Sequence, residues 1–146
     1  MSDGGSRKPV PRPTPETAPF WEGCAAGELR LQHCLECAHV QFPPRRLCTG
    51  CLSPRVAWRA ASGNGTVRSW STVVVPGAAG FEAEVPYISV LVKLEEGPTM
   101  LSVLRECRNE DVYPGMDVEV LFEPRGEEMK VPYFRPGSGA AKKAGE

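Results

Sequence analysis

Two pairs of cysteines with metal-binding spacing stand close together in the first half of the chain. Cys34 and Cys37 form one C-x2-C pair, and Cys48 and Cys51 form a second pair after ten intervening residues. Each pair can fold into a tight knuckle, so that the two pairs surround one ion with four thiolates. Four soft thiolates in a tetrahedron suit zinc, with iron as the main competitor. The spacing therefore predicts a structural Zn2+ site, with bound iron or a pair of disulfides as the alternatives.

A site of this kind predicts a supporting role rather than catalysis. Four protein thiolates leave no coordination position open to water or substrate. We interpret the remaining cysteines, Cys24 and Cys107, as small packing residues. His33 and His39 bracket the first knuckle and are interpreted as surface residues or neighbours of the ligands. Paired carboxylates, a Ser/His/Asp set and a phosphate-binding glycine loop are not recognisable, so we expect no catalytic residue in this chain.

Length and composition narrow the class of protein. The chain has 146 residues, enough for one compact domain and a small appended module, and its 15 prolines and 15 glycines predict many turns. No apolar run approaches the roughly 20 residues that cross a bilayer, and the polar start lacks the apolar core of a secretion signal. Cysteines in a metal-type pattern favour a reducing compartment. We therefore expect a cytoplasmic protein that does not enter a membrane.

The N-terminal part is expected to place the cysteines on a small ribbon. Residues 1–15 are rich in Ser, Gly, Arg and Pro and predict a flexible arm. Residues 16–60 predict a short helix and the ribbon. Thr17 can cap the helix, Pro19 is tolerated in its first turn and Gly27 can end it. Short strands before and after the knuckles contain too little apolar mass to fold without a metal.

Residues 61–136 are expected to form a separate β domain, which makes the fold mainly β. Alternating apolar residues predict strands near 66–75, 87–94, 100–104, 118–122 and 131–134. In the first strand, Val67, Val73 and Val75 are expected on one face, with Trp70 and Val74 on the other. Periodicity does not reveal strand order, so short strands joined by glycine turns fit either a small closed barrel of the OB type or an open sandwich. We favour the barrel because closure removes exposed edges. Residues 137–146 predict a flexible tail.

Charge is divided unevenly between the two parts. Residues 28–60 contain five arginines against two glutamates, a net charge of +3, whereas residues 81–128 contain twelve acidic residues against four basic ones, a net charge of -8. A barrel that binds a phosphodiester strand needs the opposite sign and stacking aromatics. The sequence therefore argues against nucleic-acid binding, and an anionic small ligand belongs near the basic ribbon.

Many short motifs in this order resemble those of one known family. They are Phe20-Trp21, Gly27, residues 29–32, the two cysteine pairs, Phe42-Pro43-Pro44-Arg45, Gly63-x-Gly65-Thr66-Val67, Pro86-Tyr87, Glu96-Gly97, Gly115-Met116-x-Val118 and Phe134-Arg135-Pro136. The chain is similar to the DUF35 family, whose members have an OB-fold domain after a rubredoxin-like zinc ribbon. The resemblance covers residues 15–136.

The resemblance implies a non-catalytic zinc-binding subunit in a hetero-oligomer with a thiolase-like acyl-CoA enzyme. The partner, a thiolase or aldolase, would carry the catalytic residues and hold most of the acyl-CoA, in the degradation of aromatic or steroid-type CoA thioesters. Arg45 and Arg46 are candidates to meet a CoA phosphate, because paired guanidinium groups suit anions. A MaoC-like enoyl-CoA hydratase is the alternative partner. A rubredoxin-like iron protein for electron transfer is a further alternative.

The knuckles depart from the family pattern at three positions. The family often has Gly after the second cysteine of each pair and Pro after the third cysteine, where this chain has Ala38, Leu52 and Thr49. Glycine suits the knuckle because a positive φ lets backbone N–H groups approach sulfur. We expect Ala38 and Leu52 to make the turn costlier or different without removing a ligand.

Overall fold

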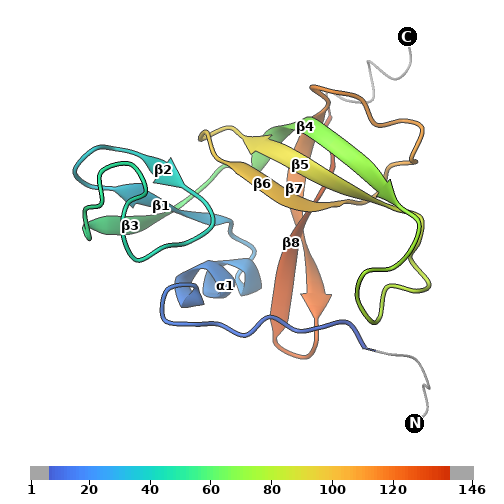
Figure 1. Ribbon diagram of the computed structural model, residues 1–146, viewed down its shortest axis with the longest axis horizontal. Coiled ribbons are helices and arrows are strands. Elements are labelled where there is room, and N and C mark those ends of the chain that lie inside the picture. The colour runs from blue at the N-terminus through green and yellow to red at the C-terminus, as the bar shows by residue number, and fades with distance from the viewer. Residues whose placement is uncertain (1–6, 139–146) are drawn as a thin grey trace.

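The computed structural model describes residues 7–138 and shows a small ribbon beside a larger barrel (Figure 1). The outer parts of the predicted arm and tail, residues 1–6 and 139–146, lie outside the described residues. Helix α1 (Ala18–Ala25) lies between the two units. No helix among the described residues is long and apolar enough to cross a membrane.

Pro19 and Gly27 take their predicted places at the ends of α1, but Thr17 does not cap the helix with its side chain. Pro19 stands in the first turn, and Gly27 follows the helix with a φ of +81°. The N–H of Gly27 donates to the carbonyl of Cys24 at 3.0 Å, which satisfies one of the free carbonyls at the helix end. Thr17 is the N-cap residue, but its hydroxyl makes no capping bond and contacts Thr14 instead. The helix therefore depends on packing rather than on its cap.

Three short strands make up the ribbon. Strand β1 (Arg30–Cys34) is central and pairs antiparallel with β2 (Val40–Gln41) and with β3 (Val56–Ala60). The pairing of β1 with β3 closes the segment that contains both knuckles. Strand β2 does not stand out in the sequence because two residues show no periodicity.

Five strands close into the predicted OB-type barrel. They are β4 (Asn64–Val73), β5 (Tyr87–Leu94), β6 (Thr99–Leu104), β7 (Asp117–Arg125) and β8 (Met129–Pro136), in the closed order β4-β5-β6-β8-β7. The seam between β6 and β8 is parallel and is paired only at Leu104 and Phe134. Helix α1 packs against β8. The mainly β fold class and the barrel are confirmed.

One core joins the helix, the start of the ribbon and the barrel interior. Its largest fully buried side chains are those of Phe134, Leu29, Leu31, Ile88, Leu94, Val90, Val92 and Val118. Alternation in β5 places every second side chain inside, as the sequence predicts. The burial of Leu29 and Leu31 in the same cluster ties the ribbon to the barrel.

The prediction of which side chains in the first barrel strand face the core is wrong. β4 ends at Val73, and Val74 and Val75 are exposed in the loop that follows. A register shift between Val67 and Ser69 marks a β-bulge. The bulge inserts an extra residue, so Trp70 packs against the same core as Val67 instead of facing away from it.

The described end of the predicted arm lies along the barrel rather than apart from it (Figure 1). Lys8 forms an ion pair with Glu84. The guanidinium Nη1 of Arg125 donates to the carbonyl of Pro9 at 3.1 Å. The composition of residues 1–15 does not reveal these contacts, because both partners on the barrel lie more than seventy residues away.

Candidate metal centre

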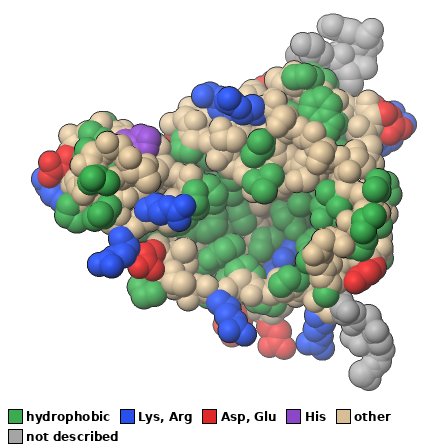
Figure 2. Space-filling model, in the orientation of Figure 1, with side chains coloured by type: hydrophobic (Ala, Val, Ile, Leu, Met, Phe, Trp, Pro, Cys, Tyr) green, Lys and Arg blue, Asp and Glu red, His purple; other side chains and the backbone are tan. Residues whose placement is uncertain are grey.

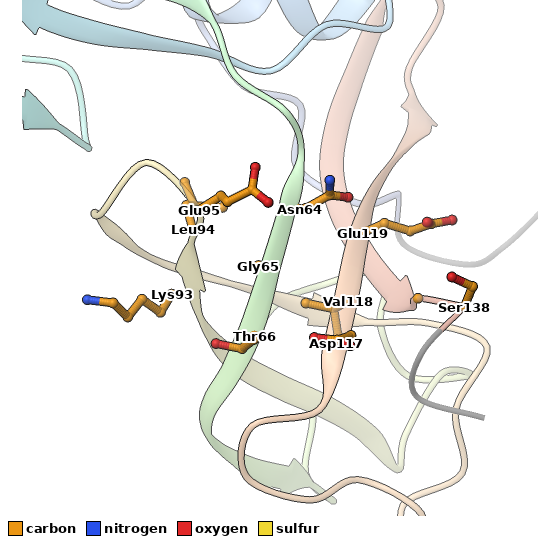
Figure 3. A pocket seen from close by; sticks show the side chains of 11 residues that line it. Asn64, Gly65, Thr66, Lys93, Leu94, Glu95, Asp117, Val118, Glu119 and Ser138 are labelled. Carbon is orange, nitrogen blue, oxygen red and sulfur yellow. The ribbon is translucent and has the colours of Figure 1, made fainter. Parts of the chain in front are cut away.

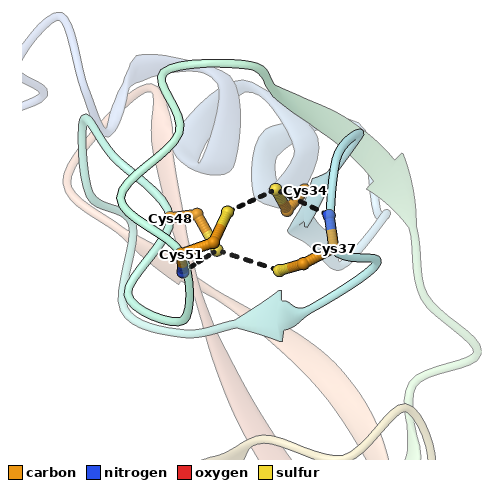
Figure 4. Close-up of side chains that lie close together, drawn as sticks. All are labelled: Cys34, Cys37, Cys48 and Cys51. Carbon is orange, nitrogen blue, oxygen red and sulfur yellow. Dashed lines mark hydrogen bonds between the residues drawn. The ribbon is translucent and has the colours of Figure 1, made fainter.

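The four predicted ligands come together at one end of the ribbon (Figure 4). Sγ atoms of Cys34, Cys37, Cys48 and Cys51 all lie within 4.8 Å of one another. The Cys34–Cys51 and Cys37–Cys48 Sγ distances are both 3.6 Å. A tetrahedron with metal–sulfur bonds of about 2.3 Å has edges of about 3.8 Å. The spacing of the sulfurs therefore fits one tetrahedral ion, and all four cysteines are free of disulfides.

Backbone N–H groups support one sulfur in each knuckle. Glu36 and Cys37 donate to Sγ of Cys34 at 3.3 and 3.4 Å. Gly50 and Cys51 donate to Sγ of Cys48 at 3.2 and 3.4 Å. Cys34 and Cys48 are also the two buried members of the set. The two knuckles thus repeat one another, with an inner sulfur that accepts two N–H groups.

Ala38 and Leu52 keep the knuckle turn in spite of their side chains. Both have a φ of +67°, in the left-handed region that favours glycine. The N–H of Ala38 donates to the carbonyl of Cys34, and the N–H of Leu52 donates to that of Cys48. The turn is therefore retained at a conformational cost.

The environment of the thiols favours a bound cation. The N–H of Cys37 is the largest cause that lowers the pKa of Cys34 to about 6. The N–H of Ser53 lowers the pKa of Cys51, but burial and the neighbouring thiols outweigh it and raise that pKa to about 12. The cluster holds one thiolate readily and resists further ionisation unless a cation balances the charge. The donor set therefore fits a metal, which would bridge the two knuckles.

Two buried glutamines hold the segment between the knuckles. Gln32 bonds both the N–H and the carbonyl of Arg45, each at 2.8 Å. Gln41 donates to the carbonyl of Leu47 at 3.2 Å and accepts from the N–H of Thr49 at 2.8 Å. Sequence reasoning missed both glutamines, because nothing in their spacing distinguishes them from exposed polar residues of a strand.

The other candidate residues surround the cluster without joining it. Arg45 and Arg46 are exposed, and within residues 7–138 neither guanidinium takes part in an ion pair. His39 Nε2 contacts Thr49 Oγ1 at 3.0 Å and so links the two knuckles. His33 Nε2 is buried without a partner in the described part of the chain, and burial lowers the pKa of this ring.

An apolar groove of about 300 Å3 lies where the helix and ribbon meet the barrel. Its lining comes from α1, the loop after β2, β6 and β8, and comprises Thr17, Phe20, Trp21, Phe42, Pro43, Pro44, Met100, Leu101, Ser102, Pro132 and Tyr133. Figure 2 shows hydrophobic side chains gathered in the hollow between ribbon and barrel. The groove lies over the sparsely paired seam between β6 and β8, and the Pro43-Pro44 segment leads directly to Arg45.

A second, open hollow has the wrong charge for a phosphate. It measures about 490 Å3 and crosses β4 between β5 and β7 (Figure 3). Its charged lining residues are Glu95, Asp117 and Glu119 against Lys93. An anionic ligand is therefore disfavoured on this side of the barrel.

Comparison with protein families matches both units of the chain. Residues 21–57 match the ChsH2 rubredoxin-like zinc ribbon domain, and residues 58–123 match the ChsH2 C-terminal OB-fold domain. A DUF35 domain-containing scaffold protein from Methanothermobacter thermautotrophicus is 32% identical over 65% of this chain and 71% of its own length. The chain belongs to the DUF35 family. The predicted resemblance is confirmed.

Other relatives carry two kinds of name. A DUF35 domain-containing scaffold protein from Pyrococcus furiosus is 40% identical over 59% of this chain and 62% of its own length. The 3-oxo-4,17-pregnadiene-20-carboxyl-CoA hydratase alpha subunit from Mycobacterium tuberculosis is 34% identical over 77% of this chain. This DUF35 chain spans only 35% of that subunit's length. The match therefore covers part of each of these two relatives.

A solved structure matches most of this DUF35 chain. A chain of the Ltp2-ChsH2(DUF35) aldolase superposes with a TM-score of 0.78 at 28% sequence identity. The match includes 87% of this chain and 98% of that chain. Ribbon, helix and barrel therefore occur together in both proteins.

Proposed function

We propose that this DUF35 protein is a non-catalytic, zinc-binding subunit of an acyl-CoA thiolase or aldolase complex. The observation that carries the proposal is the match to nearly the whole length of a chain in the Ltp2-ChsH2(DUF35) aldolase. The relatives from Pyrococcus furiosus and Methanothermobacter thermautotrophicus are also named scaffold proteins. The chain would support a thiolase-like catalytic subunit that supplies the reacting groups.

The chemistry of the cysteines supports a non-catalytic role. Zinc bound by Cys34, Cys37, Cys48 and Cys51 would have a complete set of ligands and would serve to hold the ribbon together. Cys24 is fully buried, and this burial raises the pKa of its thiol to about 12. Burial also raises the pKa of Cys107. A nucleophilic cysteine needs the opposite shift, so neither thiol is suited to acyl transfer.

The proposed contact with the acyl-CoA involves the loop after β2. Arg45 and Arg46 would meet a CoA phosphate, since both guanidinium groups are exposed and without an ion pair in the described chain. The backbone of Arg45 is fixed by Gln32, which limits the entropy lost on binding. Aromatic or steroid-type acyl groups are the proposed substrates, held mainly by the catalytic partner.

A MaoC-like enoyl-CoA hydratase is the second candidate partner. It is favoured by two relatives named as hydratase alpha subunits, from Thermomonospora curvata and Mycobacterium tuberculosis. In both cases this chain accounts for 40% or less of the relative's length. A rubredoxin-like iron protein is a third candidate, supported only by the four-thiolate set, and it leaves the barrel without a role.

Co-expression tests these candidates. The chain is produced with thiolase-like or MaoC-like subunits of the source genome, one at a time, and each complex is assayed for cleavage or hydration of CoA thioesters. The proposal expects a stable complex with a thiolase-like subunit and C–C bond cleavage that neither protein shows alone. Elemental analysis of the same samples should give one zinc per chain; iron with a redox-active visible spectrum would support electron transfer instead.

A further inference from the structure

Leu52 combines a costly conformation with an exposed apolar side chain. Its φ is +67°, and 71% of its surface is exposed. A left-handed conformation is unfavourable for a residue with a Cβ atom and is usually occupied by glycine. Ala38 occupies the matching position of the first knuckle with the same φ. The leucine side chain therefore contributes little to the stability of the fold, which points to a role in binding another molecule.

Two further leucines lie beside the same cysteines. Leu35 is 50% exposed and follows Cys34, whose sulfur lies 3.6 Å from that of Cys51, the residue before Leu52. Leu47 is 44% exposed and precedes Cys48. The other large exposed hydrophobic residues of the described chain are spread over the arm and barrel: Val10, Val74, Val75 and Leu101. The knuckle face comprises the three exposed leucines beside the cysteines, Leu35, Leu47 and Leu52.

The knuckle face is held rigidly from beneath. Gln41 bonds the carbonyl of Leu47, and N–H···S bonds fix the turns that carry Leu35 and Leu52. Two buried glutamines thus fix the backbone of this surface segment. Binding of the metal by the four cysteines does not itself require these glutamines. A preformed surface loses little conformational entropy on association.

Charge around the knuckle face indicates the chemistry of its partner. Residues 28–60 have a net charge of +3 with neutral cysteines, which one Zn2+ with four thiolates would reduce to +1, and residues 81–128 have -8. A partner surface with carboxylates is attracted to the ribbon and repelled by the barrel. The centres of protein interfaces are apolar and arginine is enriched in interfaces, so exposed leucines on an arginine-rich ribbon suit a docking surface.

We propose that the knuckle face docks the catalytic subunit, with Leu52 inserted into an apolar pocket that is rimmed by carboxylates. This inference rests on the proposed function and adds to it the surface and the anchoring side chain. The metal cluster then has a second consequence, because the ion that closes the knuckles also fixes the docking surface. A second copy of this chain is the competing occupant, since its barrel is acidic. Nucleic acid is disfavoured, because exposed leucines have no role on a phosphate backbone.

The test compares two glycine substitutions at equivalent positions. Leu52→Gly and Ala38→Gly relieve the same backbone strain, but only the first removes an apolar anchor. Dissociation constants are measured by titration of the zinc-loaded chain into the thiolase-like subunit that forms a complex with the wild type. We expect Leu52→Gly to weaken binding by about tenfold or more, as for a buried anchor, and Ala38→Gly to leave it unchanged. Zinc content and melting temperature should be equal to or above wild type in both.

Leu35→Ser serves as a second variant that does not alter a left-handed residue, and it should weaken binding severalfold. Equal affinity of wild type, Leu52→Gly and Leu35→Ser would overturn the docking surface while leaving the proposed function intact. Failure of the wild type to bind any thiolase-like subunit would overturn the proposed function and the inference together. Concentration-dependent self-association of the wild type that Leu52→Gly abolishes would assign the surface to a second copy. Salt-dependent retention on heparin that is lost with Arg46→Glu but not with Leu52→Gly would contradict the docking proposal. It would indicate that the surface binds a polyanion.

Discussion

The side-chain amide of Gln41 donates a hydrogen bond of 2.8 Å to Oε1 of Gln32, and both side chains are buried in the ribbon. Gln32 Oε1 also accepts from the N–H of Arg45, and Gln41 Oε1 accepts from the N–H and hydroxyl of Thr49. Besides the backbone pairing of β1 with β2, the two side chains connect these strands to the segment from Arg45 to Thr49. They therefore replace the strand pairing that this short segment lacks.

Gln41→Ala should destabilise the ribbon strongly. The substitution leaves the N–H of Thr49 and the carbonyl of Leu47 without Gln41 and removes one of the two bonds to Gln32 Oε1, at a cost of about 1–3 kcal/mol. Thr49→Val is the control, because it removes the hydroxyl contacts with Gln41 and His39 but keeps the N–H bond to Gln41, and it should cost less than about 1 kcal/mol. Chemical denaturation of the zinc-loaded proteins measures both values. Equal stability of Gln41→Ala and wild type would show that the glutamine pair does not hold the segment.

Removal of the metal should unfold the ribbon and spare the barrel. The knuckles are joined through the four cysteines, whereas β4 to β8 close on a continuous apolar core. A chelator under reducing conditions should therefore collapse the amide signals of residues 30–60 in a 15N-correlation spectrum while those of 87–136 stay dispersed. Readdition of zinc should restore them. Ribbon signals that remain dispersed without metal would contradict the structural role of the ion.

Cys24 should make the protein less stable at high pH. Burial raises the pKa of its thiol from 9.0 to about 12, so the folded state keeps a proton that the unfolded state loses. Stability from this difference is complete below pH 9 and decreases by about 1.4 kcal/mol per pH unit between 9 and 12. Unfolding free energies of wild type and Cys24→Ala, measured from pH 8 to 10.5, should approach each other as the pH rises. A constant difference would mean that the thiol ionises normally in the folded state.

Arg105 should stabilise the closed end of the barrel at neutral pH. Its guanidinium bonds both oxygens of Glu123 and Oε1 of Glu84 at 2.9–3.1 Å and lies 4.7 Å from the ring of Tyr133. Loss of the guanidinium removes the ion pair of partly buried Glu123 and leaves Glu84 with Lys8 alone, so Arg105→Met should cost about 1–2 kcal/mol. Arg108→Met is the matched control, because Arg108 is 74% exposed and pairs only with Asp111 in the described chain.

The effect of Arg105→Met should decrease in acid. Burial raises the pKa of Glu84, but hydrogen bonds from Lys8 and Arg105 outweigh it and leave that pKa below 4.5. A lowered carboxyl pKa stabilises the folded state above pH 4.5, and this contribution is lost as the pH falls through the folded-state pKa. Thermal unfolding of the variant and wild type at pH 7 and pH 3 should show a smaller difference at pH 3.

Local patterns in the sequence suffice for part of this structure. The β5 strand begins and ends at the predicted residues because its alternation from Tyr87 to Leu94 is uninterrupted. The spacing of the cysteines likewise predicts which four sulfurs come together. Both features depend on residues close in sequence, where period and spacing determine the geometry.

Features set by distant contacts are not predictable in this way. The bulge after Val67 changes the face of Trp70, and no residue type at this point marks it. Gln32 and Gln41 are buried because the segment between the knuckles folds back over them, which the order of polar and apolar residues does not reveal. The contacts of Lys8 and Pro9 with the barrel also join residues far apart in the chain.

The most direct test of the proposed role is turnover by a thiolase-like subunit with and without this chain. The subunit is purified alone and as a co-expressed complex, and cleavage of a CoA thioester with an aromatic or steroid-type acyl group is followed by release of the product CoA ester. We expect activity only in the complex, with one zinc per DUF35 chain. Full activity of the catalytic subunit alone, at the same concentration and stability, would contradict the account.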